Sequence, residues 1–64
     1  MTEEPYPILA HFDYEHLPPN LAAISRGFHQ LAHHMAKQLP QGPETAAGLR
    51  KLLEAKDCFV RAAL

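Results

Sequence analysis

Six prolines divide this chain of 64 residues, and their positions restrict its fold more than any other feature of the sequence. They occur as three close pairs: Pro5 and Pro7, Pro18 and Pro19, Pro40 and Pro43. A proline inside a helix removes a backbone hydrogen bond and clashes with the preceding turn, whereas one in the first turn is harmless. The stretches 20–39 and 44–64 contain no proline. We therefore expect an N-terminal arm followed by two helices.

The first long stretch, residues 19–38, has the spacing of an amphipathic helix. Its apolar residues recur at steps of three and four: Leu21, Ile24, Phe28, Leu31, Met35 and Leu39. The segment PQGP predicts a turn over 39–43, and the acidic Glu44 suits the positive end of a second helix over about 44–63. A short loop between two long helices indicates an antiparallel hairpin. The sequence thus predicts an all-α fold, with a hairpin over 18–64 and an arm over 1–17 that is extended or contains one short helix.

The hairpin alone is too small to bury its own apolar residues. A domain of this size has a marginal core, and the single Cys58 rules out an internal disulfide. At about 100° per residue the second helix carries an apolar arc of about 200°, of which one partner helix covers about half. The excess lies on Leu52, Ala55, Phe59 and Ala62. We expect a homo-oligomer to bury it. The alternative cover is the arm, whose apolar residues include Ile8, Leu9, Phe12 and Leu17.

Charge and composition exclude several functions. Residues 1–17 contain four acidic residues and no Lys or Arg, whereas residues 18–64 contain all six basic residues against three acidic ones. That excess is too small for duplex DNA as a partner, but it fits a small anionic ligand. No stretch approaches the roughly 18 apolar residues of a membrane span. The acidic start lacks the features of a signal peptide, so we expect a cytoplasmic protein.

Catalytic signatures are absent from the sequence. It has no serine–histidine–acid order, no glycine-rich phosphate loop and no paired carboxylates. We therefore expect neither enzyme activity nor a cofactor.

Lys56 is the least expected residue of the second helix, because it lies within the apolar arc. One interpretation is structural: its stem packs on apolar neighbours, while its ammonium reaches water or pairs with Asp57 or the partner subunit's Glu54. The other is that Lys56 faces a cavity between protomers and binds a phosphate. The sequence leaves both open.

A basic stripe on the first helix is the better candidate for anion binding. Arg26, His29, His33 and Lys37 follow one another at steps of three and four residues, so they share one side of the helix. An anionic ligand along this stripe would meet up to four donors, whereas the alternative is a solvated polar face. His29 and His33 would also suit zinc. No third ligand has convincing spacing, so we expect no metal site.

Three further residues lie near the ends of the helices. Tyr14 precedes the first helix, where it can stack on a nucleobase or hold the arm in place. Arg61 follows Asp57 by one turn, which predicts an ion pair within the helix. Arg61 is also placed to cap the last carbonyls. Cys58 is expected to be a small buried residue.

The order of these elements resembles one known family. YEHLPP, an amphipathic helix and LPQGPETAAGLRKLLEAKDCFVRAAL are similar to the hairpin domain of the phage cyclic-nucleotide sponges that antagonise CBASS and Thoeris immunity. The similarity is strongest over residues 39–63. It implies a non-enzymatic protein in the cytoplasm of the infected bacterium that sequesters cyclic di- or trinucleotides or cyclic ADP-ribose isomers. It also implies a homo-oligomer, commonly a hexamer, with pockets between protomers.

The resemblance assigns roles to individual residues. Tyr14 matches the aromatic that stacks on a base, and Arg61 matches an arginine of a separate trinucleotide pocket. The family's phosphate-binding lysine of the first long helix has no lysine counterpart here, and Arg26 or His29 stands nearby. Because imidazole is charged mainly below about pH 6.5, a histidine in this role makes affinity weaker or pH-dependent.

Together these arguments give two candidate functions. The first is sequestration of a cyclic oligonucleotide. The predicted ligand-binding residues are Tyr14, Arg26, His29, His33, Lys56 and Arg61. The alternative is a small helical adaptor or phage regulator that binds another protein through its apolar face.

Overall fold

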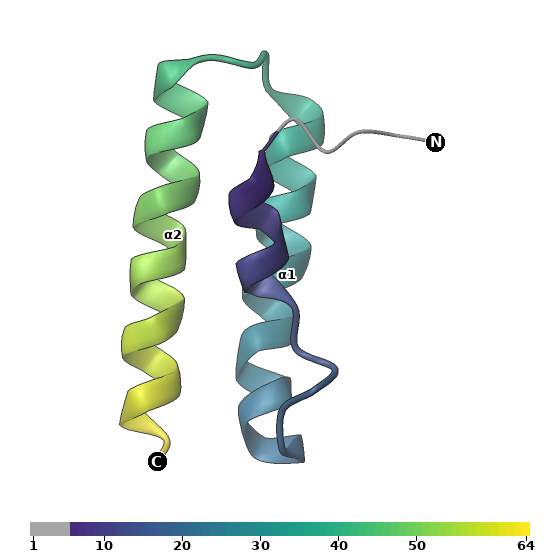
Figure 1. The fold of residues 1–64 in the computed structure, drawn as a ribbon, viewed down its shortest axis with the longest axis vertical. Helices are drawn as coiled ribbons and strands as arrows, with labels where there is room; N and C mark the ends of the chain where they lie inside the picture. The colour runs from purple at the N-terminus through teal and green to yellow at the C-terminus, as the bar shows by residue number, and fades with distance from the viewer. Residues whose placement is uncertain (1–5) are drawn as a thin grey trace.

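The helical hairpin is the main feature of the structure, a computed structural model that describes residues 6–64. The first five residues of the expected arm lie outside the described residues. Helix α1 (Pro19–Gln38) and helix α2 (Pro43–Ala62) run antiparallel and pack together (Figure 1). A short 3₁₀ helix, η1 (Pro7–Phe12), precedes them. The described part of the chain is 78% helix and has no strand, which confirms the all-α hairpin.

Prolines begin both long helices. Pro19 and Pro43 occupy the first turns of α1 and α2, where their missing N–H groups would have no helical partner in any case. Glu44 lies in the first turn of α2, at the positive end of its dipole. Between the helices, the Leu39 N–H donates to the Met35 carbonyl, and Thr45 Oγ1 donates to the Pro40 carbonyl at 2.9 Å. The turn is therefore fixed by hydrogen bonds as well as by its prolines.

Of the two forms expected for the arm, extended or with one short helix, the structure has the short helix, since residues 7–12 form η1. A 3₁₀ helix has three residues per turn, so residues three apart share one face. Tyr6, Leu9 and Phe12 have this spacing, and all three are buried. Pro7, at the start of η1, fixes a backbone angle that suits the helix. Burial of the side chains at every third position explains why the segment is helical.

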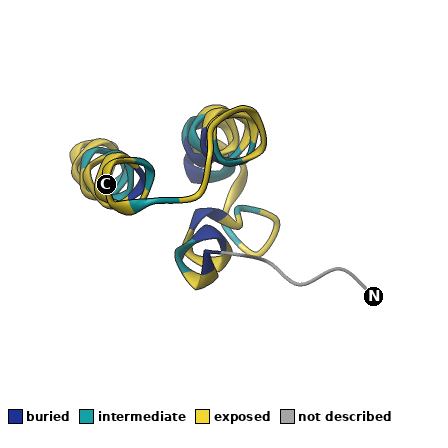
Figure 2. Cartoon of the chain, turned by 90° about the horizontal axis from the view of Figure 1, so that it is seen from above, coloured by how far each residue is buried: buried dark blue, intermediate teal, exposed yellow. Residues whose placement is uncertain are grey.

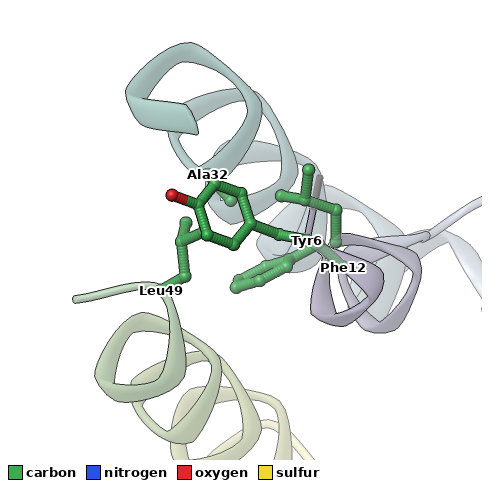
Figure 3. Close-up of a cluster of buried hydrophobic side chains, with 5 residues drawn as sticks. Tyr6, Phe12, Ala32 and Leu49 are labelled. Carbon is green, nitrogen blue, oxygen red and sulfur yellow. The ribbon is translucent and has the colours of Figure 1, made fainter. Parts of the chain in front are cut away.

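The core lies where η1, α1 and α2 meet. Seen from above, the three segments stand at the corners of a triangle and turn their buried residues inward (Figure 2). Phe12 and Tyr6 of the N-terminal segment meet Ala32 of α1 and Leu49 of α2 (Figure 3). The Gly42 N–H donates to the Tyr6 hydroxyl at 3.2 Å, which ties this segment to the turn. Burying a side chain the size of Phe12 or Leu49 contributes roughly 1.5–3 kcal/mol.

The buried face of α1 agrees only in its first half with the one that its apolar spacing predicts, where Ile24 and Phe28 are half-buried. Leu21 is buried as expected, but Leu31, Met35 and Leu39 are 43%, 37% and 46% exposed. Ser25 and Ala32 are fully buried instead. Both neighbours of α1 pack on one part of its surface, and η1 approaches it over small side chains. The large residues are left on the side that neither neighbour covers.

The N-terminal segment covers only part of the surplus apolar surface. Ile8 packs against the core from η1, and Leu52 and Leu53 pack against it from α2. Phe59 stacks on Phe28, with ring centroids 5.8 Å apart, yet remains 57% exposed. Ala62 is also exposed. We call the uncovered residues the open apolar face: Leu31, Met35, Leu39 and Phe59.

Among residues 6–64, no helix combines the length and the apolar character that crossing a bilayer requires.

Candidate functional site

Three of the predicted site residues come together beside the N-terminal segment. Tyr14 lies in the stretch between η1 and α1, and its ring meets the His29 ring edge-on at a centroid distance of 5.2 Å. His33, one turn further along α1, lies 4.3 Å from His29 between ring centroids. All three residues are half-buried. We call Tyr14, His29 and His33 the aromatic cluster.

The aromatic cluster has unused hydrogen-bonding capacity. His29 Nδ1 and His33 Nε2 are shielded from solvent, and neither has a hydrogen-bond partner within the described residues. Asp13 Oδ1 is 3.9 Å from His29 Nδ1, too far for a hydrogen bond but close enough for attraction to a charged imidazole. The sequence interpretation did not select Asp13. Its position beside Tyr14 was the available signal, but its contact with α1 depends on how η1 folds back.

A groove runs beside the aromatic cluster, between η1 and α1. Its volume is about 420 Å³, within the size range of small-molecule sites. It is lined by Tyr6, Pro7, Leu9, Ala10, Asp13 and His33. The groove thus combines apolar walls with one carboxylate and one imidazole.

The remaining members of the basic stripe stay in solvent. Arg26 precedes His29 by three residues and Lys37 follows His33 by four, and both are exposed. They add positive charge along α1 without being held against other residues. Such long, free side chains are able to close on an anion bound at the aromatic cluster.

Within one chain, the contacts of Lys56 match its structural interpretation. Its side chain is only 12% exposed, and its Nζ lies 2.9 Å from Asp57 Oδ1. The stem is buried while the charge meets a carboxylate that is itself 46% exposed. Lys56 is therefore engaged within its own helix rather than in the aromatic cluster.

The predicted Asp57–Arg61 ion pair does not form. Asp57 pairs with the neighbouring Lys56, whose buried stem leaves its ammonium few other partners. Arg61 Nη2 instead lies 3.4 Å from Cys58 Sγ. The expectation that Cys58 is buried is also wrong: it is exposed, because it lies on the side of α2 that faces neither α1 nor η1. Arg61 is exposed as well, on the last turn of α2.

A second groove lies on the open apolar face. It is bounded by Leu31, Met35 and Leu39 of α1 and by α2 residues that include Gly48 and Leu52, and its volume is about 270 Å³. Its lining is almost entirely apolar. This is a surface for packing rather than for binding a charged ligand.

Neither metal-ligand geometry nor comparison with known proteins assigns a further role to these residues. Within residues 6–64, no three His, Cys, Asp or Glu side chains come together as metal ligands would. No family model, curated protein or solved structure matched the chain. The candidate site is therefore characterised by its own geometry.

Proposed function

We propose that the protein binds and sequesters a cyclic oligonucleotide, and so withdraws the signal of CBASS- or Thoeris-type antiphage defence. The observation that carries this proposal is the contact of Tyr14 with His29, beside His33. A cyclic di- or trinucleotide, or a cyclic ADP-ribose isomer, presents flat bases and anionic phosphates together. The aromatic cluster offers an aromatic ring to the bases and nitrogen donors to the phosphates. Binding would be stoichiometric, without turnover.

The individual residues have matching chemistry. Stacking of a base on an aromatic side chain contributes roughly 1–3 kcal/mol, and Tyr14 is half-exposed beside the groove-lining Asp13. An imidazole donates to phosphate through a ring N–H, and Arg26 adds a planar guanidinium one turn away along α1. This arrangement supports the roles that the family resemblance gives to Tyr14 and to a basic residue near His29. Arg61, exposed at the far end of α2, is retained as a candidate for a separate pocket.

Assembly is the second part of the proposal. The groove beside the aromatic cluster is open, so one chain covers only one side of a ligand. The open apolar face gives copies of the chain a reason to associate, because each large apolar side chain removed from water contributes roughly 1.5–3 kcal/mol. Association would place ligand sites between protomers. The resemblance indicates a hexamer.

A protein-binding adaptor is the second candidate function. The observation that favours it is the apolar groove between Leu31, Met35 and Leu39 and the start of α2. A groove of this kind accepts the apolar side of a partner helix. This function requires no anion and leaves the aromatic cluster without a role.

Thermal unfolding with a panel of cyclic oligonucleotides separates the two candidates. A ligand at about 100 times its dissociation constant stabilises the folded protein by roughly 2.7 kcal/mol. We expect a clear rise in the melting temperature with at least one member of the panel, and its loss in Tyr14→Ala. His34→Ala is the matched control, because His34 lies on the same helix but is exposed outside the aromatic cluster. If no cyclic oligonucleotide stabilises the unaltered protein, the adaptor becomes the better proposal.

A further inference from the structure

In the part of the chain that the structure describes, three buried polar atoms without partners lie in one row along α1. They are Ser25 Oγ, His29 Nδ1 and His33 Nε2, and their spacing of four residues places them on one side of the helix. Buried polar atoms are almost always hydrogen-bonded, so each exception calls for an explanation. A serine hydroxyl can turn back to a carbonyl of its own helix. A rigid imidazole ring cannot turn back in this way, so the two shielded imidazole nitrogens, which have no partner among residues 6–64, require another explanation.

The protonation state of the two imidazole rings supplies this explanation. A neutral imidazole carries one N–H, and its other nitrogen is a lone pair that can remain unpaired at less cost than an N–H. The shielded nitrogens, His29 Nδ1 and His33 Nε2, fit this lone-pair role. The second nitrogen of each ring, which is not shielded in this way, then carries the N–H and is free to donate to a ligand. In a charged imidazole both nitrogens carry hydrogen, and the shielded one needs an acceptor.

The surroundings of the two rings are unequal. From the N-terminal segment, Asp13 approaches His29 Nδ1 to 3.9 Å, and Tyr14 packs on the same ring. Tyr6 lines the groove near His33, and its hydroxyl accepts the Gly42 N–H. Along α1, the exposed Arg26 and Lys37 flank the pair. The described ring and ion contacts of the pair involve no residue of α2.

Among residues 6–64, only His29 has an anion within reach of its shielded nitrogen. We propose that His29 takes up a proton when a phosphodiester binds, with Asp13 accepting its Nδ1–H, while His33 stays neutral and donates to the same phosphate. Two charged rings with centroids 4.3 Å apart would repel each other, which keeps the second ring neutral. This inference rests on the proposed function and makes ligand capture proton-coupled: the affinity is highest at low pH and falls as pH rises.

Linkage determines the size of the effect. For the imidazole group in general, the charged fraction falls about tenfold between pH 5.5 and pH 7.5. If only the charged ring binds, the dissociation constant rises about tenfold between these two pH values. Binding at pH 7 should take up roughly 0.5–1 proton. Asp13 acts as a positioning residue, because its proposed partner is the imidazole of His29 rather than the ligand.

Calorimetric titration with a cyclic dinucleotide, 3′,3′-cyclic GMP–AMP, tests the inference. Affinity is measured at pH 5.5 and 7.5, and proton uptake at pH 7 in buffers of unlike ionisation enthalpy. The unaltered protein should bind about tenfold more weakly at pH 7.5 and take up a proton. His29→Lys, which carries a permanent charge, should bind equally at both pH values with no uptake. His33→Ala should bind more weakly at both but keep the tenfold ratio. His34→Ala is the control and should match the unaltered protein.

The outcomes separate this inference from the proposed function. Equal affinity of the unaltered protein at the two pH values, without proton uptake, overturns proton coupling and leaves sequestration intact. Persistence of the tenfold ratio in His29→Lys also overturns it, because the titrating group is then elsewhere. If neither the unaltered protein nor His29→Lys binds at either pH, the proposed function is overturned for this ligand. The inference is then overturned with it.

Discussion

Lys56 illustrates how a charged side chain is accommodated in the apolar face of a small helix. Its methylene stem replaces an apolar side chain, and its ammonium is neutralised at 2.9 Å by the adjacent Asp57. Its position in the helix was predictable, and Asp57 was one of the partners that the sequence offered it. Asp57 had two basic neighbours in the sequence, Lys56 and Arg61, and helical spacing favoured the wrong one. The buried stem decided the outcome, because it limits where the ammonium can go.

Replacing Lys56 by methionine tests this structural role. Methionine fills the space of the stem, and Asp57 remains 46% exposed and hydrated after its partner is lost. We expect the free energy of unfolding, measured with urea, to change by less than about 1 kcal/mol. The control Lys56→Asp should destabilise by about 2–4 kcal/mol, since it removes the stem and places two like charges side by side. A large loss in Lys56→Met would contradict this account.

Asp13 is the residue of the candidate site that was hardest to predict from the sequence. Its carboxylate is 61% exposed, so its attraction to His29 is weak, and we expect a correspondingly small effect of Asp13→Asn. Affinity for the cyclic dinucleotide at pH 6.5 should fall about threefold, within the range of an exposed ion pair. The melting temperature without ligand should not change measurably. An increase in affinity would show that Asp13 repels the phosphate instead of supporting the imidazole.

At the scale of elements, η1 is the part of the fold that was hardest to foresee. The two long helices follow from proline positions and from apolar spacing sustained over many residues. In η1 the only signal is three residues at steps of three, Tyr6, Leu9 and Phe12, which is too short a run to distinguish from chance. The segment is helical because the hairpin offers it a surface, so its structure depends on contacts that are remote in the sequence.

Phe12→Ala measures how strongly η1 holds the fold together. Phe12 is fully buried, and its removal should cost about 3–5 kcal/mol of the free energy of unfolding in urea. That loss is comparable with the whole stability of so small a domain. Phe59→Ala is the matched control: Phe59 is 57% exposed, and losing its stacking on Phe28 should cost only about 1 kcal/mol. Equal losses would show that η1 contributes little.

Helix α1 contains a glycine that its fold does not need. A Cβ added at Gly27 meets no atom within 4 Å, and the residue is exposed in the middle of the helix. Gly27→Ala should therefore raise the free energy of unfolding by about 0.5–1 kcal/mol. Urea denaturation at low protein concentration measures this. Destabilisation that appears only at high concentration would indicate that another copy packs closely against Gly27.

At the scale of the whole molecule, the uneven covering of the hairpin decides what the chain can do. On one side of the hairpin, η1 packs on the helices and forms the groove next to the aromatic cluster. On the other side, no described segment covers the open apolar face. His29 and His33 were predicted because their spacing places them on one side of α1 with Arg26 and Lys37, and Tyr14 because it precedes the helix. Their actual contact depends on how the N-terminal segment packs against the hairpin.

Association through the open apolar face is the prediction that belongs to this scale. Met35→Glu places a charge in the apolar groove, where burial against another copy would be costly. We expect the unaltered protein to be oligomeric at micromolar concentration by light scattering, and Met35→Glu to be monomeric. Gln30→Glu, exposed on the same helix, is the control and should remain oligomeric. A monomeric unaltered protein would remove the physical basis for sites between protomers.

The hydrogen bond from Gly42 to Tyr6 joins residues that are 36 positions apart. Contacts of the two long helices near their turn close a much shorter loop, so they can form first, and the contact of Tyr6 with the turn follows. Tyr6→Phe should therefore leave the folding rate unchanged and speed unfolding, which stopped-flow kinetics would show. Unfolding would then start with detachment of the N-terminal segment from the hairpin. The groove beside the aromatic cluster would be the first part of the molecule to be lost.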